Sequence, residues 1–586
     1  MNATLDSRVT EEPQVHEKRT LADVDSMNGI VGEPLYSPEV FGSSSAGEFM
    51  RQIKAGIDAR LGLVQSTASI AQEPSPLPFP AVHRDRTNYG EDSRHFTLPP
   101  RGLADRLMLA YWDANWALYP LVNRSEVEAD YKAVWSGGDL QYNEYTTMCI
   151  LNTCFALGCQ YSDAVPTEQR RRAGAEYFTR ARHLQINSTD QVSVEAVQCL
   201  LLMGSYLQTT SEVHECWMMV GKAIRIAQSI GLHQPRYWDH QDSIRRREYA
   251  RRAWYGCVFM DRVLSMTFGR PAMTPEWLSN AVPLPAMIDD EYLDTQKEGS
   301  ANSPDGNPCV MAFAVKALQL YGIMNDILLT LYTRDEEQKR STRELARILE
   351  LDEQLQSWHD SIPSFLYMSS DSQRSIIFQR QAFILRIRYL HIRILLLRPI
   401  LARPWHQSTP RRAANSDDSL GKIMLDQGSL VCFQAAHELI NIFKTSPDLE
   451  SLSGTLPGWW YSILYLYTAA TVVLAEKLKN HGSEVESSPS NSQDLNSWDD
   501  VISILRRYGK VGEIAKRCVA ALEILAAKIS PGAAVANGQG TDEPGHEEDV
   551  SLVNPHCGLD VNWESVLSTL DVDSMTWLSS MSADLY

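Results

Sequence analysis

The strongest candidates for chemistry are four acidic side chains in one short stretch, Asp289, Asp290, Glu291 and Asp294. Hard cations such as Mg²⁺ need several carboxylate oxygens around one point, and helical cyclases that act on prenyl diphosphates place such acids on one helix face. Here the acids follow two prolines, which indicates a loop, and Leu293 stands where the last aspartate would be needed. No second Asn/Ser/Glu metal motif follows downstream. We therefore do not expect a magnesium site here.

Other catalytic signatures are missing from the sequence. It contains no HExxH, GxSxG, P-loop or GxGxxG motif. The ten cysteines include no CxxC pair, and most lie in apolar runs, where a free cysteine behaves as a small hydrophobic residue. We predict no catalytic residue, no cofactor and no metal ligand in these residues, so the protein is not expected to be an enzyme.

Asp261 is the most informative charged residue, because it falls on an apolar helical stripe between 250 and 268. A half-buried carboxylate needs a partner. We predict a structural ion pair of Asp261 with Arg225 of the preceding helix or with Arg270.

A dense arginine run lies at the start of the same segment, at positions 245–247, 251 and 252. One interpretation is a nuclear-import signal or a DNA contact. The other is the solvated half of an amphipathic helix, in which Glu248 pairs with Arg251 or Arg252 at helical spacing. We favour the second interpretation, because such pairs are common on helix surfaces.

These residues are set in a segment, 101–528, whose apolar positions recur almost throughout with helical periodicity. The expected helices span 103–122, 192–209, 211–233, 243–271, 310–332, 342–362, 379–401, 428–444, 459–478 and 499–528. Ser211 and Gly231 are expected to cap the 211–233 helix. Alternating strand patterns are scarce. The sequence predicts an all-α fold, a large irregular multi-helix domain.

The flanking segments differ in composition. Residues 1–40 are polar and are expected to be disordered, and 41–100 form a linker with a short helix near 41–62. Polar stretches at 402–427 and 479–498 are expected to be disordered insertions. The apolar segment 459–475 is short for a membrane span and is predicted to be a core helix, so no membrane partner is expected.

The C-terminal segment 529–586 is an acidic tail, with ten Asp or Glu residues and no Lys or Arg. Apolar side chains are interspersed among its acids and serines: Trp563, Leu567, Leu570, Trp577, Leu578 and Met581. This pattern is typical of disordered activation segments that become ordered in a partner's groove. The alternative is a solvated extension that folds back onto the helical body.

The central block 200–285 resembles the regulatory region of fungal zinc-cluster transcription factors. The resemblance rests on GLH (231–233), on RRAWYGCVFMDR (251–262), and on FGRP followed by VPLP, in that order and at that spacing. It extends outward over about 41–528, with FGSSSAGEF, LADRLMLAYWDANWALYPLV, LDEQLQSWHDSIP and RYLHIRILLLRPIL. The resemblance implies an all-α domain that governs the activity of the transcription factor through intramolecular masking, dimer formation or metabolite response.

The sequence departs from the family pattern in the module that binds DNA. The family's two-zinc cluster of six cysteines beside basic residues has no counterpart in these residues, so zinc is expected of the family but its ligands are not found here. The chain is acidic, with 54 Lys and Arg against 73 Asp and Glu, whereas DNA-binding modules carry a basic patch. Three interpretations stay open: a module encoded upstream, a module lost so that the protein acts as a coregulator, or another surface that contacts DNA.

From these observations we expect a nuclear transcription regulator of a metabolic or biosynthetic gene set, acting through its helical domain and acidic tail. Its expected partners are promoter DNA, contacted directly or through a partner transcription factor, a coactivator, and a second subunit in a homo- or heterodimer. The main alternative is a helical adaptor that binds other regulators without activating transcription itself. A helical lyase or cyclase is the remote third class.

Overall fold

A computed structural model gives the structure of the chain. It describes residues 43–60, 92–188, 192–235, 243–293, 306–333, 342–368, 375–402, 420–446, 449, 451, 454–480 and 491–529. The predicted disordered N-terminus (1–40) and all but the first residue of the acidic tail, including the six apolar residues named above, lie outside these ranges.

The described residues form sixteen α-helices and no β-strand, as the helical periodicity predicts. The first eight are α1 (Ala46–Arg60), α2 (Arg101–Tyr111), α3 (Arg124–Ser136), α4 (Glu144–Tyr161), α5 (Thr167–Asn187), α6 (Val194–Leu207), α7 (Val213–Ser229) and α9 (Ile244–Phe268). The others are α10 (Glu276–Ser279), α11 (Met311–Leu331), α12 (Thr342–Asp360), α13 (Ile376–Ala402), α14 (Leu420–Thr445), α15 (Trp459–Asn480), α16 (Asn491–Tyr508) and α17 (Glu513–Ile529).

Local capping signals account for several helix ends. The Ser243 side chain accepts a hydrogen bond from Arg246 N at the start of α9, and Gly269 ends that helix in the left-handed region at φ 66°. Gly231, at φ 82°, follows α7 as predicted. The predicted N-cap Ser211 is displaced by one residue, because Glu212 occupies that position and its side chain makes no capping bond.

The predicted helix 103–122 is interrupted earlier than its apolar stripe suggests. α2 ends at Tyr111 and passes into η2, a single π-helical turn at Trp112–Trp116. π-turns insert one residue into a helix and often occur at functional sites. The helix ends after this turn, and residues 118–121 are buried except for the half-buried Tyr119.

Three predictions in the C-terminal half of the chain were wrong. The single helix expected at 499–528 is two helices, α16 and α17, joined by a turn at 509–512. Gly509 and Gly512 favour the break: a Cβ at Gly509 would lie 2.9 Å from the Arg506 carbonyl oxygen, and one at Gly512 would lie 2.9 Å from the Trp459 ring. The expected insertion at 479–498 is partly helical, because α15 extends to Asn480 and α16 already begins at Asn491. Likewise, α14 starts at Leu420, inside the insertion expected at 402–427.

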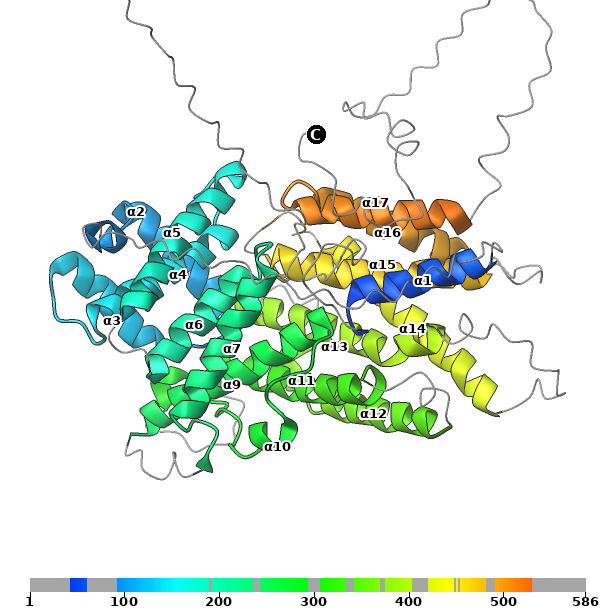
Figure 1. Ribbon diagram of the computed structural model, residues 1–586, viewed down its shortest axis with the longest axis horizontal. Coiled ribbons are helices and arrows are strands. Elements are labelled where there is room, and N and C mark those ends of the chain that lie inside the picture. Colours follow the sequence, from blue (N-terminus) through cyan, green and yellow to red (C-terminus); the bar gives the residue numbers. More distant parts are fainter. Residues whose placement is uncertain are drawn as a thin grey trace, which may run out of the picture.

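The core is organised around α13, which packs against α11, α12, α14 and α15 (Figure 1). Helices α2 to α5 gather at one end of the molecule, shown in blue and cyan. α15 contains the 459–475 segment, and nearly all its side chains are buried, as predicted for a core helix. Within the described ranges, α11 is the one helix long and apolar enough to span a membrane, but 67% of its most apolar window is buried inside the protein.

The short helix predicted near 41–62 is present as α1, and it packs against α15 and α17, far from it in sequence (Figure 1). Buried Arg398 of α13 fixes it: its Nη2 donates to the Ser44 carbonyl at 2.9 Å, and its guanidinium lies 4.7 Å from the Phe49 ring centroid. Ser44 Oγ also donates to the Met266 carbonyl at 3.1 Å. The serine-rich segment before α1 is thus an integral part of the bundle.

Candidate functional site

Asp261 is buried on α9, with 5% of its surface exposed. Its carboxylate accepts hydrogen bonds from Met273 N (3.1 Å), Thr274 N (2.7 Å) and Thr274 Oγ1 (2.6 Å). Burial raises the pKa of Asp261, and these hydrogen bonds oppose that rise. The residue therefore fixes the loop that follows α9.

The partner of Asp261 differs from the predicted ion pair. Among the described residues no salt bridge joins it to Arg225 or to Arg270; the Arg225 guanidinium reaches Gln228, and that of Arg270 lies over the Trp217 and Phe268 rings. The physical reason is the turn at Gly269, which brings two backbone N–H groups and a hydroxyl back along α9. These donors satisfy the buried carboxylate, and the charge of the neighbouring buried Arg262 also favours its ionised form.

The arginine run contains the predicted helical pairs, but they are buried rather than solvated. Glu248 accepts from Arg251 Nη1 at 3.3 Å and from Arg252 Nε at 3.1 Å. Arg252 Nη1 also pairs with Asp290 at 2.6 Å, and Glu248 Oε1 accepts from Ala286 N at 3.0 Å. This Glu248–Arg252–Asp290 triad fastens the 284–290 segment to α9.

The two aspartates of the acidic stretch serve different elements. Asp289 accepts from Val310 N at 3.3 Å, Met311 N at 3.2 Å and Cys309 Sγ at 3.2 Å, so it stabilises the start of α11. Asp290 belongs to the buried triad. The segment is a loop with one 3₁₀ turn at Asp290–Tyr292, as the prolines indicate, and Asp294 lies outside the described residues.

A pocket lies between α9, α11 and the segment that follows the π-turn. Its volume is about 530 Å³ when the space open to solvent at its mouth is included. The walls are mostly apolar, and the paired Arg252 lies at its edge. The lining residues are Leu118, Tyr119, Pro120, Leu121, Ser205, Arg252, Tyr255, Gly256, Phe259, Met260, Pro285, Met311, Ala314, Ala317 and Leu318.

Arg388 of α13 lies behind two walls of this pocket and was not singled out from the sequence. It is 2% exposed, and its guanidinium carbon lies 5.3 to 5.5 Å from the ring centroids of Tyr119, Phe259, Phe313 and Tyr321. We call these four rings the aromatic cage. Nη2 donates to the Tyr119 hydroxyl, whereas Nε and Nη1 have no hydrogen-bond partner among the residues that the structure describes.

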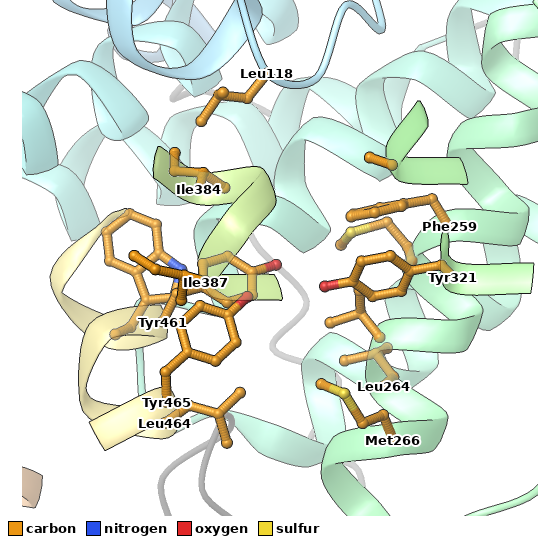
Figure 2. Close-up of a cluster of buried hydrophobic side chains, with 14 of the residues drawn as sticks. Leu118, Phe259, Leu264, Met266, Tyr321, Ile384, Ile387, Tyr461, Leu464 and Tyr465 are labelled. Atoms are coloured by element: carbon orange, nitrogen blue, oxygen red, sulfur yellow. The ribbon is translucent and has the colours of Figure 1, made fainter. Parts of the chain in front are cut away.

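Tyrosine hydroxyls border the same region. Figure 2 shows Tyr461 and Tyr465 of α15 on one side and Tyr321 and Phe259 on the other, with phenolic oxygens turned toward one another. Burial raises the pKa of Tyr321, Tyr461 and Tyr465, so these phenols stay neutral and do not offset the guanidinium charge. Within the described ranges no salt bridge of Arg388 with a carboxylate is found.

The neighbouring His391 supplies a pH-dependent prediction. Burial, together with the charge of Arg398, lowers the pKa of His391 to about 3, and its ring packs edge-on against Tyr465 at 4.9 Å. Because the unfolded chain takes up this proton near pH ~6.5 and the folded chain only near 3, the stability contribution is complete above pH ~6.5 and is lost as the pH falls. Within this window, each unit by which the pH falls lowers the free energy of unfolding by about 1.4 kcal/mol.

We expect His391→Phe to reduce this acid sensitivity, because phenylalanine fills the same space and takes no proton. The urea midpoint of the variant should fall less than that of the wild type between pH ~7 and pH ~5. His214→Phe, at an exposed position, is the control and should follow the wild type. Identical pH profiles for His391→Phe and the wild type would show that His391 does not titrate in this way.

The signal for Arg388 is present in the sequence but weak. RYLHIRILLLRPIL, residues 388–401, places arginines in a helix that is otherwise apolar on every side, and a charge on such a helix must be buried or reach a surface. Helical periodicity alone does not distinguish a buried arginine from one that reaches the surface. The rings that surround it come from three separate segments.

Residues 108–360 match the family model described as the fungal specific transcription factor domain. That range includes α9, α11, the acidic loop and the whole pocket lining, whereas Arg388 lies beyond it.

Relatives match over a longer range. The chain is 28% identical over 513 residues to sorbicillinoid biosynthetic cluster transcription factor 2 of Penicillium rubens, covering 83% of this chain and 69% of the relative. It is 27% identical to sorbicillinoid biosynthetic cluster transcription factor sor3 of Hypocrea jecorina, covering 82% and 68%. Activator of stress genes 1 of Saccharomyces cerevisiae is 23% identical, covering 64% and 38%. Residues 108–360 are thus similar to the fungal specific transcription factor domain, and these relatives are named as fungal transcription factors and as an activator of stress genes.

Proposed function

We propose that this protein regulates transcription of a set of genes in the nucleus, and that the set is a biosynthetic gene cluster. The observation that carries the proposal is the match of residues 108–360 to the fungal specific transcription factor domain, within a chain whose relatives include two named regulators of such clusters. The relatives are named as transcription factors, and the proposed activity is regulation without catalysis.

In this proposal the helical body responds to the regulatory signal, and the acidic tail activates transcription. The tail carries Trp563, Leu567, Leu570, Trp577, Leu578 and Met581 among acids, the composition of a segment that docks its apolar side chains in a coactivator groove. Promoter DNA is reached directly or through a partner transcription factor, and the body forms a homo- or heterodimer.

A helical adaptor is the second candidate function. The excess of acidic residues favours it, because DNA affinity depends on Lys and Arg that displace counterions from phosphates. An adaptor would bind another regulator through the same helical body, and its tail would not activate transcription.

Fusion of residues 529–586 to a foreign DNA-binding domain distinguishes the two functions. We expect the fusion to activate a reporter gene, and we expect Trp563→Ala combined with Trp577→Ala to abolish that activation, because docking depends on the apolar side chains. Ser568→Ala in the same tail is the matched control and should keep full activity. A silent wild-type fusion would refute the activator function and favour the adaptor.

A further inference from the structure

Arg388 presents an electrostatic problem that the fold alone does not solve. A guanidinium stays protonated, and burying a charge is costly unless it is paired and hydrogen-bonded. Most of the other buried arginines have stronger partners: Arg252 has two carboxylates, and Arg380 and Arg398 donate to backbone carbonyls. Arg262 donates to Ser279 Oγ and leaves only Nε buried without a partner among the described residues. Arg388 has one neutral hydroxyl and, within the described part of the chain, two N–H positions without a partner.

The aromatic cage offsets part of this cost. Cation–π contacts stabilise a desolvated guanidinium, and four rings lie within reach of this one. They leave the hydrogen-bonding capacity of Nε and Nη1 unused. Nε and Nη2 share one donor edge of the planar guanidinium, so a carboxylate that replaced the Tyr119 hydroxyl on Nη2 would also accept from Nε.

The pocket lies next to this guanidinium. Tyr119 and Phe259 both line the pocket and belong to the cage. Tyr119 is only half-buried, and its ring packs on that of Phe259 at 5.4 Å. Its hydroxyl is the one hydrogen-bond partner of Arg388 among the described residues, so it occupies the place that a stronger acceptor entering from the pocket would take.

We propose that the pocket and Arg388 form a binding site for a small apolar monoacid, with its carbon skeleton against the apolar walls and its carboxylate on Arg388 in place of the Tyr119 hydroxyl. The apolar lining favours a hydrophobic body, and the single uncompensated charge favours one negative charge. Binding of such an acid would regulate the helical body. This inference rests on the proposed regulatory function and adds a class of ligand to it.

Calorimetric titration of the purified full chain tests the site with 2-naphthoate as the probe and 2-naphthamide as its uncharged analogue of the same shape. Hydrogen bonds to charged groups predict that the acid binds about tenfold or more tightly than the amide. Arg388→Met should abolish this preference, because it keeps the volume and removes the charge. Arg386→Met is the matched control: Arg386 is on the same helix but pairs at the surface with Glu438, and the preference should be kept.

A second variant keeps the test decisive if Arg388→Met does not fold. Ala314→Phe fills the pocket from α11 without touching Arg388, and it should abolish binding of both probes. The proposal is overturned if the wild type binds neither probe, if acid and amide bind equally, or if naphthoate binds Ala314→Phe as it binds the wild type. Because the assay measures binding in the purified protein, its failure is distinct from a silent tail fusion.

Discussion

Arg252→Met is expected to lower the free energy of unfolding by about 3–5 kcal/mol, the usual cost of removing one partner from a buried ion pair. The substitution removes the cation that Asp290 pairs with and leaves Glu248, which is only 3% exposed, with the longer 3.3 Å pair to Arg251. Burial lowers the pKa of Arg252, but the two carboxylates outweigh it and raise the pKa overall, so the arginine is charged at every relevant pH. Urea unfolding followed by circular dichroism measures the loss.

An exposed ion pair provides the control for this variant. Arg347 pairs with Glu350 at 2.6 Å on α12, but the two side chains are 46% and 57% exposed. Arg347→Met should therefore change the free energy of unfolding by less than about 1 kcal/mol. Adding Glu248→Gln and Asp290→Asn to Arg252→Met should recover part of the loss, because no buried charge is then left unpaired. Equal effects of Arg252→Met and Arg347→Met would contradict the buried triad.

Gly158→Ala is the second substitution with a large expected effect. A Cβ at Gly158 of α4 would lie 2.3 Å from the Leu107 carbonyl oxygen of α2. The clash is with backbone, so no side-chain rotation relieves it, and the two helices must separate. Overpacking of this kind costs about 1–3 kcal/mol and sometimes more, and we expect a loss at the upper end of that range.

Gly102→Ala is the matched control, since nothing lies within 4 Å of a Cβ at that position in the first turn of α2. Alanine favours a helix over glycine by about 0.5–1 kcal/mol, so this variant should be as stable as the wild type or slightly more stable. Urea midpoints of the two variants, measured together, test the α2–α4 crossing. A neutral Gly158→Ala would mean that these helices do not approach as described.

Local signals explain what could be predicted from the sequence. Ser243 and Gly269 delimit α9 because a side-chain acceptor and a left-handed glycine act within one turn of the chain. The pairs of Glu248 with Arg251 and Arg252 follow from helical spacing alone. The break at Gly509 and Gly512 was also visible as two glycines, but the apolar periodicity continued across it and masked the turn.

What could not be predicted depends on the path of the chain in three dimensions. The partner of Asp261 was unpredictable because it depends on how the loop after Gly269 turns back along the helix. Arg388 was missed because its cage is assembled from residues 119, 259, 313 and 321, which no periodicity connects. The proposed site therefore exists only in the folded bundle.

The most direct test of the account is the transcript profile of cells that lack this gene, compared with cells in which the wild-type chain or Arg252→Met is restored. The account predicts that transcripts of one contiguous set of genes change together, that the wild type restores them, and that the destabilised variant does not. Unchanged transcripts after deletion, in cells shown to express the wild-type protein, would contradict the conclusion that this helical protein regulates transcription.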